Sequence, residues 1–167
     1  MIGYLRTQFG RLEVEASDLE GKCIASAYFK TMFLIFREDG AKDWFEGLGI
    51  SLKHSGTAHK LQFHHVFPKN VLKGHTEKEK INDIVNLSFI GGRTNKKISD
   101  KLPSEYLPNI VKKQGEQTLR LQCIPTDQNL WTVERYDDFL SSRRQLITDK
   151  INEFMRHDEY KERKEAL

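Results

Sequence analysis

Hydrophobic positions early in the chain recur at the spacing of a helix. Ser17 and Glu20 have the spacing of a helix capping box, and Asp39 with Gly40 ends the apolar pattern that follows. Apolar side chains cover most of the circumference of this segment, so it is predicted to be a largely buried helix. Its apolar positions are Ile24, Tyr28, Phe29, Met32, Phe33, Ile35 and Phe36.

Three later segments also favour helices. Residues 41–49, AKDWFEGLG, are predicted to form a short helix that ends in glycines, so the N-terminal part over about 17–50 is expected to be helical. Residues 104–113 are predicted to form another helix, which follows Pro103. A long helix is predicted over about 133–160, with an apolar face formed by Tyr136, Phe139, Leu140, Leu146, Ile147, Ile151, Phe154 and Met155.

Short apolar or alternating segments predict strands at 60–66, 87–90 and 118–124. The loop of about twenty residues between the first two is long for a compact domain, and loops of this length are often functional. The segment TNKKISDK, residues 94–101, is predicted to begin a helix. We find no internal repeat and no linker-like segment, so we expect one α+β domain over residues 1–167.

The composition is that of a globular protein. Hydrophobic residues make up 38% and charged residues 31% of the chain, and the longest apolar run, TMFLIF, is far shorter than the roughly 20 residues of a membrane helix. The N-terminus lacks the basic and apolar regions of a secretion signal. Cys23 and Cys123 are far apart and outside any CxxC motif, so we expect both to be reduced core residues of a cytoplasmic protein without membrane contact.

Two adjacent histidines stand in the first predicted strand, within LQFHHVFPKN at residues 61–70. Neighbouring side chains on a strand point to opposite faces, so His64 and His65 cannot both be core residues on one face. In one interpretation, one ring is buried and the other is exposed to solvent. In the other, the pair lies at the end of the strand, where both rings can border the following loop. A neutral histidine, with an ordinary pKa of about 6.5, can accept a proton from water.

The order of the polar residues that follow is typical of a nuclease family. The motifs HHVFPK, IVNLSFI and TNKKISDK give a His-His strand, a long loop, Asn86 before a second strand and Asn95 in a basic helix. This order resembles the HNH endonucleases (ββα-metal, or His-Me finger, nucleases), in which a two-stranded ribbon and one helix hold a single metal ion. It is most similar to the C-terminal nuclease domain of GmrSD-type modification-dependent (type IV) restriction enzymes. The resemblance covers about residues 60–107, and RTQFG, AKDWFEGLGI and KLPSEYL are similar to flanking segments of that subfamily.

The resemblance implies a role for each of four residues. His65 would be the general base, His64 a metal ligand, Asn86 the residue that braces the loop and the base, and Asn95 the second metal ligand. Many relatives have Asp or Glu at the position of His64 and His at the position of Asn95. A neutral imidazole is a softer ligand than a carboxylate, which leaves the metal open between magnesium, manganese and a later transition metal. We expect one divalent ion, Mg2+ first, with Mn2+, Ni2+ or Zn2+ as alternatives. Two protein ligands would leave positions open for a phosphate oxygen and the departing 3′ oxygen.

Basic residues around the motif are expected to bind nucleic acid. The net charge is only +3, but residues 93–101 hold four positive charges and a single acidic residue, Asp100. The start of the helix near Thr94 is expected to direct backbone N–H groups at a phosphate. The expected nucleic-acid-binding residues are Lys69, Arg93, Lys96, Lys97 and Lys101.

Each of these residues also has a simpler explanation. Asn86 could satisfy a turn before a strand, and Asn82 is a competing candidate for the bracing role. Asn95 could be an ordinary residue of a helix start, and lysines usually form a solvated surface. The other histidines near the motif, none at a spacing that selects it as a ligand, are His54, His59 and His75.

We therefore expect a metal-dependent DNA endonuclease that nicks or cuts phosphodiester bonds in restriction of modified or foreign DNA. The resemblance implies a parent protein with an N-terminal nucleotide-hydrolysing sensor domain, and this chain would be the nuclease part, because no GxxxxGK[ST] motif is present. Cutting of both strands could require a dimer. The alternatives are a module that binds nucleic acid or a partner without cutting, and a structural zinc or nickel site built from His64 and neighbouring histidines.

Overall fold

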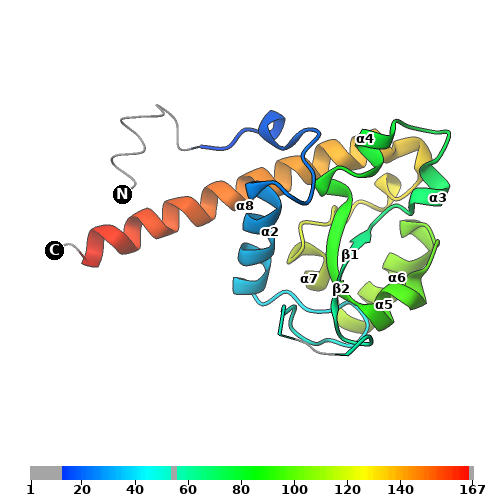
Figure 1. Cartoon of the computed structure of the whole chain (residues 1–167), viewed down its shortest axis with the longest axis horizontal. Helices are drawn as coiled ribbons and strands as arrows, with labels where there is room; N and C mark the ends of the chain where they lie inside the picture. Colours follow the sequence, from blue (N-terminus) through cyan, green and yellow to red (C-terminus); the bar gives the residue numbers. More distant parts are fainter. Residues whose placement is uncertain (1–12, 54–55, 166–167) are drawn as a thin grey trace.

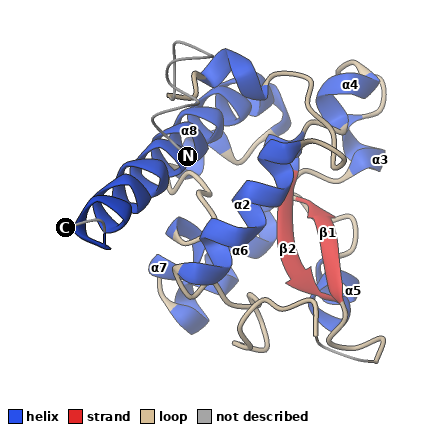
Figure 2. Ribbon diagram, turned by 60° about the vertical axis from the view of Figure 1, so that its left-hand side comes forward, coloured by secondary structure: helices blue, strands red, loops and turns tan. Residues whose placement is uncertain are grey.

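A two-stranded antiparallel sheet lies among helices (Figures 1 and 2). The computed structural model describes residues 13–53 and 56–165, with side chains as far as residue 156. This combination of helices and a small sheet confirms the α+β class. The elements are η1 (Ala16–Leu19), α2 (Ala27–Glu38), β1 (Leu61–His65), α3 (Lys69–Leu72), α4 (Lys78–Ile81), η2 (Ile84–Asn86), β2 (Leu87–Gly91), α5 (Gly92–Ile98), α6 (Pro103–Gln114), α7 (Gln117–Arg120), η3 (Gln128–Leu130), η4 (Val133–Arg135) and α8 (Tyr136–Glu165), where η marks a short 3-10 helix.

The strands predicted at 60–66 and 87–90 are confirmed as β1 and β2. Their antiparallel register places His64 opposite Ser88 and His65 opposite Leu87. The predicted long loop between them is not irregular throughout, because α3, α4 and η2 lie within it. The helix expected after the second strand is confirmed as α5, although it begins at Gly92 rather than near residue 94.

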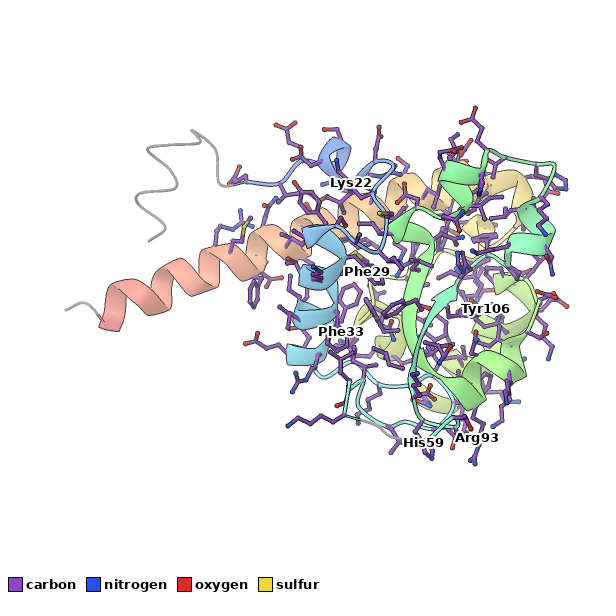
Figure 3. The ribbon with its side chains drawn as sticks, viewed as in Figure 1. Lys22, Phe29, Phe33, His59, Arg93 and Tyr106 are labelled. Carbon is purple, nitrogen blue, oxygen red and sulfur yellow. The ribbon has the colours of Figure 1, made fainter. Side chains whose placement is uncertain are left out.

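Aromatic side chains pack on both faces of this sheet. On one face, Phe29 of α2, labelled in Figure 3, packs against Phe89. The two ring centroids are 5.0 Å apart. On the other face, the rings of Trp44 and Tyr106 lie 6.1 and 6.0 Å from the ring of His64. His64 therefore belongs to the face of the sheet that is turned away from α2, because its neighbours on β1 point to the opposite side.

The first long helix begins later than predicted, so the expectation of a helix from Ser17 is wrong. α2 starts at Ala27, and the Ser26 side chain caps it. Before it, Gly21 has a positive φ of 63° and donates its N–H to the distant side chain of Asp83. This tertiary hydrogen bond holds the segment outside the helical conformation. The predicted end of the helix is confirmed.

The helix predicted at 41–49 is also wrong, so the part over about 17–50 is helical only in places. The segment forms a turn in which the carboxylate of Asp43 accepts hydrogen bonds from the N–H groups of Phe45 and Glu46. An isolated backbone bridge closes this turn. An aspartate that binds nearby N–H groups offers the backbone an alternative to helical hydrogen bonds.

The strand predicted at 118–124 is wrong as well, because the chain forms α7 there. The side chain of Gln122 nevertheless pairs with β2 as a neighbouring strand would. Its Oε1 accepts from the Phe89 N–H at 2.8 Å, and its Nε2 donates to the Phe89 C=O at 2.9 Å. A side-chain amide thus covers part of the outer edge of β2.

Both helices predicted in the second half are confirmed, as α6 and α8. The predicted long helix begins three residues later than expected, after η4, and its C-terminal part extends beyond the rest of the molecule (Figure 1). The buried guanidinium of Arg143 on α8 donates to the C=O groups of Val85 and Leu87, at 2.5 and 2.7 Å. These bonds attach α8 to the two residues that flank Asn86.

Within the part of the chain that the structure describes, no helix is long and apolar enough to cross a membrane. The prediction that both cysteines are core residues is half right. Cys123 is buried, but Cys23 is exposed in the segment before α2 that was wrongly predicted to be helical.

Gly92 is expected to be intolerant of any side chain. A Cβ built on Gly92 would lie 2.2 Å from the Thr57 C=O oxygen, a backbone atom that cannot rotate away. We expect Gly92→Ala to lower the free energy of unfolding by about 2 kcal/mol, because α5 must shift away from Thr57. Chemical denaturation measures this change. Gly49→Ala is the control, because a Cβ there meets nothing within 4 Å. Equal stability of the two variants would contradict the close approach.

Candidate active site

A cavity of about 470 Å³ lies along the outer edge of β1. Phe63 and His65 line it from one face of the strand, and His64 lines it from the other. One cavity can meet both faces of a strand only along its edge or at its end. Both histidine rings therefore border the same space, as the strand-end interpretation expects. The remaining lining residues come from the start of the interstrand loop and from α5 and its C-terminal end, and are Pro68, Lys69, Asn70, Asn95, Lys96, Ser99 and Asp100.

His64 and Asn95 meet at the wall of this cavity. The Nδ1 atom of His64 lies 2.8 Å from the Oδ1 atom of Asn95. The His64 side chain is buried, and its Nε2 atom has no hydrogen-bond partner among the described residues. The two residues are 31 positions apart in the chain, and the packing of α5 against the sheet brings them together.

Both histidine rings are neutral at neutral pH. Burial lowers the pKa of His64 to about 4, against the opposing effect of its hydrogen bond with Asn95. Burial, followed by the positive charge of Lys69, also lowers the pKa of His65 to about 4, while a side-chain hydrogen bond with Asn82 opposes this shift. A neutral ring has a free lone pair, which a metal ligand and a general base both require.

The side chain of Asn86 braces the loop between the strands. It is fully buried, and its Oδ1 accepts from the Phe67 N–H at 2.9 Å. Its Nδ2 donates to the C=O groups of Phe67 and Ile81, at 3.2 and 3.0 Å. These bonds use both N–H groups of the amide. The side chain that forms a hydrogen bond with His65 is instead Asn82, the competing candidate for the bracing role.

The five basic residues expected to bind nucleic acid separate into two groups. Lys69 and Lys96 line the cavity. Arg93 and Lys97 instead form ion pairs with Glu46, at 3.2 and 3.4 Å. The fifth, Lys101, donates to the C=O of Lys97 rather than pointing into the cavity.

The expected anion site at the start of α5 is wrong, because its donors are already used. The Gly91 N–H and the Thr94 hydroxyl both donate to the carboxylate of Asp43, at 2.6 and 2.5 Å. The N–H groups of Gly92 and Arg93 donate to backbone C=O groups. A carboxylate thus occupies this end of the helix, and it fixes the position of α5 against the sheet.

Three polar residues at the cavity were not selected from the sequence, in addition to Phe63 and Pro68. Asn70 donates to Asp100 at 3.3 Å, a bond that links α3 to the end of α5. Ser99 has a positive φ of 52°, a strained conformation of the kind that often occurs at functional sites. The sequence identifies Asp100 only as a local negative charge. No sequence spacing connects Asn70 with Asp100, because the fold alone brings α3 and α5 together.

The other histidines take no part in this cavity as far as the structure describes them. His59 and His75 are absent from its lining, and His54 lies outside the described residues. No cluster of three or more His, Cys, Asp or Glu side chains suited to a metal ion occurs in residues 13–53 and 56–156. The polar atom that the structure places beside His64 Nδ1 is the amide oxygen of Asn95.

Comparison with known proteins gives one archaeal relative and no family. No family model matches the chain, and no solved structure matches it. The chain is 30% identical over 99 residues to an uncharacterized protein of Methanocaldococcus jannaschii. The match covers 59% of this chain and 16% of the archaeal protein, so the chain spans only a small part of that relative's length.

Proposed function

We propose that this protein is a metal-dependent endonuclease that hydrolyses phosphodiester bonds of DNA, with β1, β2 and α5 as an HNH-type core. One observation carries the proposal: His64 Nδ1 and Asn95 Oδ1 converge to 2.8 Å at a cavity that His65 also lines. The order of the ribbon, Asn86 and the helix along the chain also supports the proposal. Phosphodiester hydrolysis requires a base, metal-ligand atoms and positive charge, and the cavity provides a neutral base, two ligand atoms and two lysines that form no ion pair with a described side chain.

The residues at the cavity fit a single divalent ion. His64 Nδ1 and Asn95 Oδ1, which lie 2.8 Å apart, would hold the ion, because a neutral imidazole nitrogen and an amide oxygen both act as metal ligands. We propose Mg2+, with Mn2+, Ni2+ and Zn2+ as alternatives. When bound, the ion would neutralise charge on the phosphate and stabilise the departing 3′ oxygen.

His65 would accept the proton of the attacking water. The ring is neutral because burial lowers its pKa to about 4, and its Nε2 atom has no partner among the described residues. Asn82 would orient the ring, and Asn86 would hold the loop beside it through Phe67. Lys69 and Lys96 would bind the phosphates on either side of the cleaved bond, so binding would weaken as salt rises.

We further propose that the domain works within a longer protein whose N-terminal nucleotide-hydrolysing domain senses modified or foreign DNA. The match to a short part of a much longer archaeal protein is in keeping with this arrangement. Two copies of the chain would pair to cut both strands, whereas one copy would nick.

Relaxation of supercoiled plasmid by the purified chain tests the proposal. We expect conversion to the nicked circle with Mg2+ or Mn2+, none with EDTA, and a rate that falls as salt increases. A chain that retards the plasmid in a gel but leaves it supercoiled with each of the four metals would contradict the nuclease. That result would favour a module that binds DNA without cutting.

A further inference from the structure

Phe63 is the only exposed aromatic residue among the side chains that the structure describes, and it lines the cavity beside the two histidines. Its side chain is 45% exposed. On its buried side, the ring makes edge contacts with Phe29 and Phe89, with centroids 4.9 and 5.8 Å apart. These contacts hold the ring in place, so an incoming flat group would meet a rigid apolar surface.

The backbone beside Phe63 is an open strand edge. On β2, the N–H and C=O of Phe89 point away from β1, because both bond to Gln122. Phe63, the residue opposite Phe89, therefore also turns its N–H and C=O away from β2. His65 does the same, because this direction alternates from residue to residue along an antiparallel strand. No described residue pairs with these outward groups. The edge of β1 thus offers unpaired N–H donors along the cavity.

The charges around this edge suit an anionic chain. Lys69 and Lys96 line the cavity, and neither makes an ion pair with a described side chain. Asp100, the acidic residue of the lining, already accepts a hydrogen bond from Asn70. Two free ammonium groups, two backbone N–H donors and one aromatic ring therefore lie around a single cavity.

We propose that Phe63 and the outer edge of β1 form a stacking subsite for an unpaired base next to the phosphate that is cut. The substrate would then be single-stranded DNA or locally opened duplex. This inference rests on the proposed nuclease function and adds the substrate class. A base within a duplex is stacked between its neighbours, so it reaches an aromatic side chain only after it has left the stack. Lysine side chains alone would not distinguish the two forms, because both carry the same phosphates.

Binding of a fluorescent oligonucleotide, as a single strand and as a duplex, tests the subsite with the full chain in EDTA, where no cutting occurs. We expect Phe63→Leu, which keeps an apolar side chain against Phe29, to weaken single-strand binding about fivefold or more. Duplex binding should not change. Phe63→Trp should restore single-strand binding, because it restores the aromatic face. Leu34→Ala, an exposed apolar residue on α2 outside the cavity, is the control.

A second measurement does not depend on how the variants fold. In the wild-type chain, NMR signals of the Phe63 ring protons should shift on titration with the single strand and stay unchanged with the duplex. Unchanged single-strand affinity in Phe63→Leu, or absent ring shifts, would overturn the subsite. If Phe63→Leu instead lost self-association by light scattering and kept its DNA affinity, the edge would bind a second copy of the chain, and the subsite would also be wrong. In both cases, nicking by the wild-type chain would still support the proposed nuclease function. A wild-type chain that neither binds nor nicks DNA would contradict the nuclease function as well as the subsite.

Discussion

Replacing His65 by Ala is expected to slow plasmid nicking by at least about 100-fold without loss of metal binding. A positioned general base contributes roughly 10²- to 10⁴-fold to a hydrolysis rate. The ring of His65 is neutral and lines the cavity, and its buried Nε2 atom has no hydrogen-bond partner among the described residues, so it can accept a proton. Single-turnover nicking with Mg2+, together with Mn2+ affinity from electron paramagnetic resonance, measures the two effects separately.

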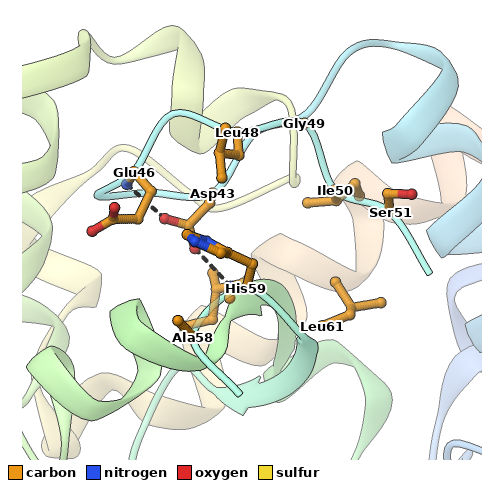
Figure 4. A pocket seen from close by; sticks show the side chains of 11 residues that line it. Asp43, Glu46, Leu48, Gly49, Ile50, Ser51, Ala58, His59 and Leu61 are labelled. Atoms are coloured by element: carbon orange, nitrogen blue, oxygen red, sulfur yellow. Dashed lines mark hydrogen bonds between the residues drawn. The ribbon is translucent and has the colours of Figure 1, made fainter. Parts of the chain in front are cut away.

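The matched control is His59→Ala. His59 lies beside Asp43 and Glu46 in a different, small pocket (Figure 4), so its removal changes the histidine content without touching the cavity. We expect this variant to nick at the wild-type rate. Equal nicking by His65→Ala and the wild type would exclude His65 as the base, although the metal site could still exist.

The second large effect is expected for Asn95→Ala, which should weaken Mn2+ affinity at least about tenfold and slow nicking with it. Asn95 supplies one of the two proposed ligand atoms, and mutation of residues that only support metal ligands already costs about 10- to 100-fold. Alanine is the best helix former, so α5 should remain intact. The readouts are Mn2+ titration by electron paramagnetic resonance and circular dichroism for the helix.

Two further variants, Asn95→Asp and Lys96→Ala, separate the loss of a metal ligand from the loss of DNA binding. A carboxylate is a harder ligand than an amide, so Asn95→Asp should bind Mg2+ at least as tightly as the wild type. Lys96→Ala, the neighbouring cavity residue, should weaken DNA binding while metal affinity stays unchanged. Undiminished Mn2+ affinity in Asn95→Ala would show that the 2.8 Å contact with His64 is only a hydrogen bond inside the protein.

Several elements could be predicted from the sequence because their own apolar patterns determine them. The helices α6 and α8 bury one side of a regular repeat, and the strands at 60–66 and 87–90 are short apolar runs, of which the second is buried on both faces. Such a repeat stabilises one local structure wherever the rest of the chain lies. The order of His64, His65, Asn86 and Asn95 along the chain was likewise sufficient to select one candidate site.

The wrong predictions fall where distant residues supply the hydrogen bonds. The segment at 118–124 alternates as a strand does, yet it contributes only the amide of Gln122 to the sheet. Asp43 forms a turn where a helix was predicted, and its carboxylate also accepts hydrogen bonds from the Gly91 N–H and the Thr94 hydroxyl. Neither partnership follows from local spacing, because the residues are about 30 to 50 positions apart.

By itself, the sequence determined which residues carry the candidate chemistry and which segments pair as strands, because residue identity and short-range periodicity are local properties. Only the tertiary structure decided where these residues point. It brought both faces of β1 to one cavity and assigned the hydrogen bond of His65 to Asn82. It also turned Arg93 and Lys97 toward Glu46 and filled the start of α5 with Asp43. Each of these outcomes depends on packing between segments far apart in the chain, and local propensity contains no information about such contacts.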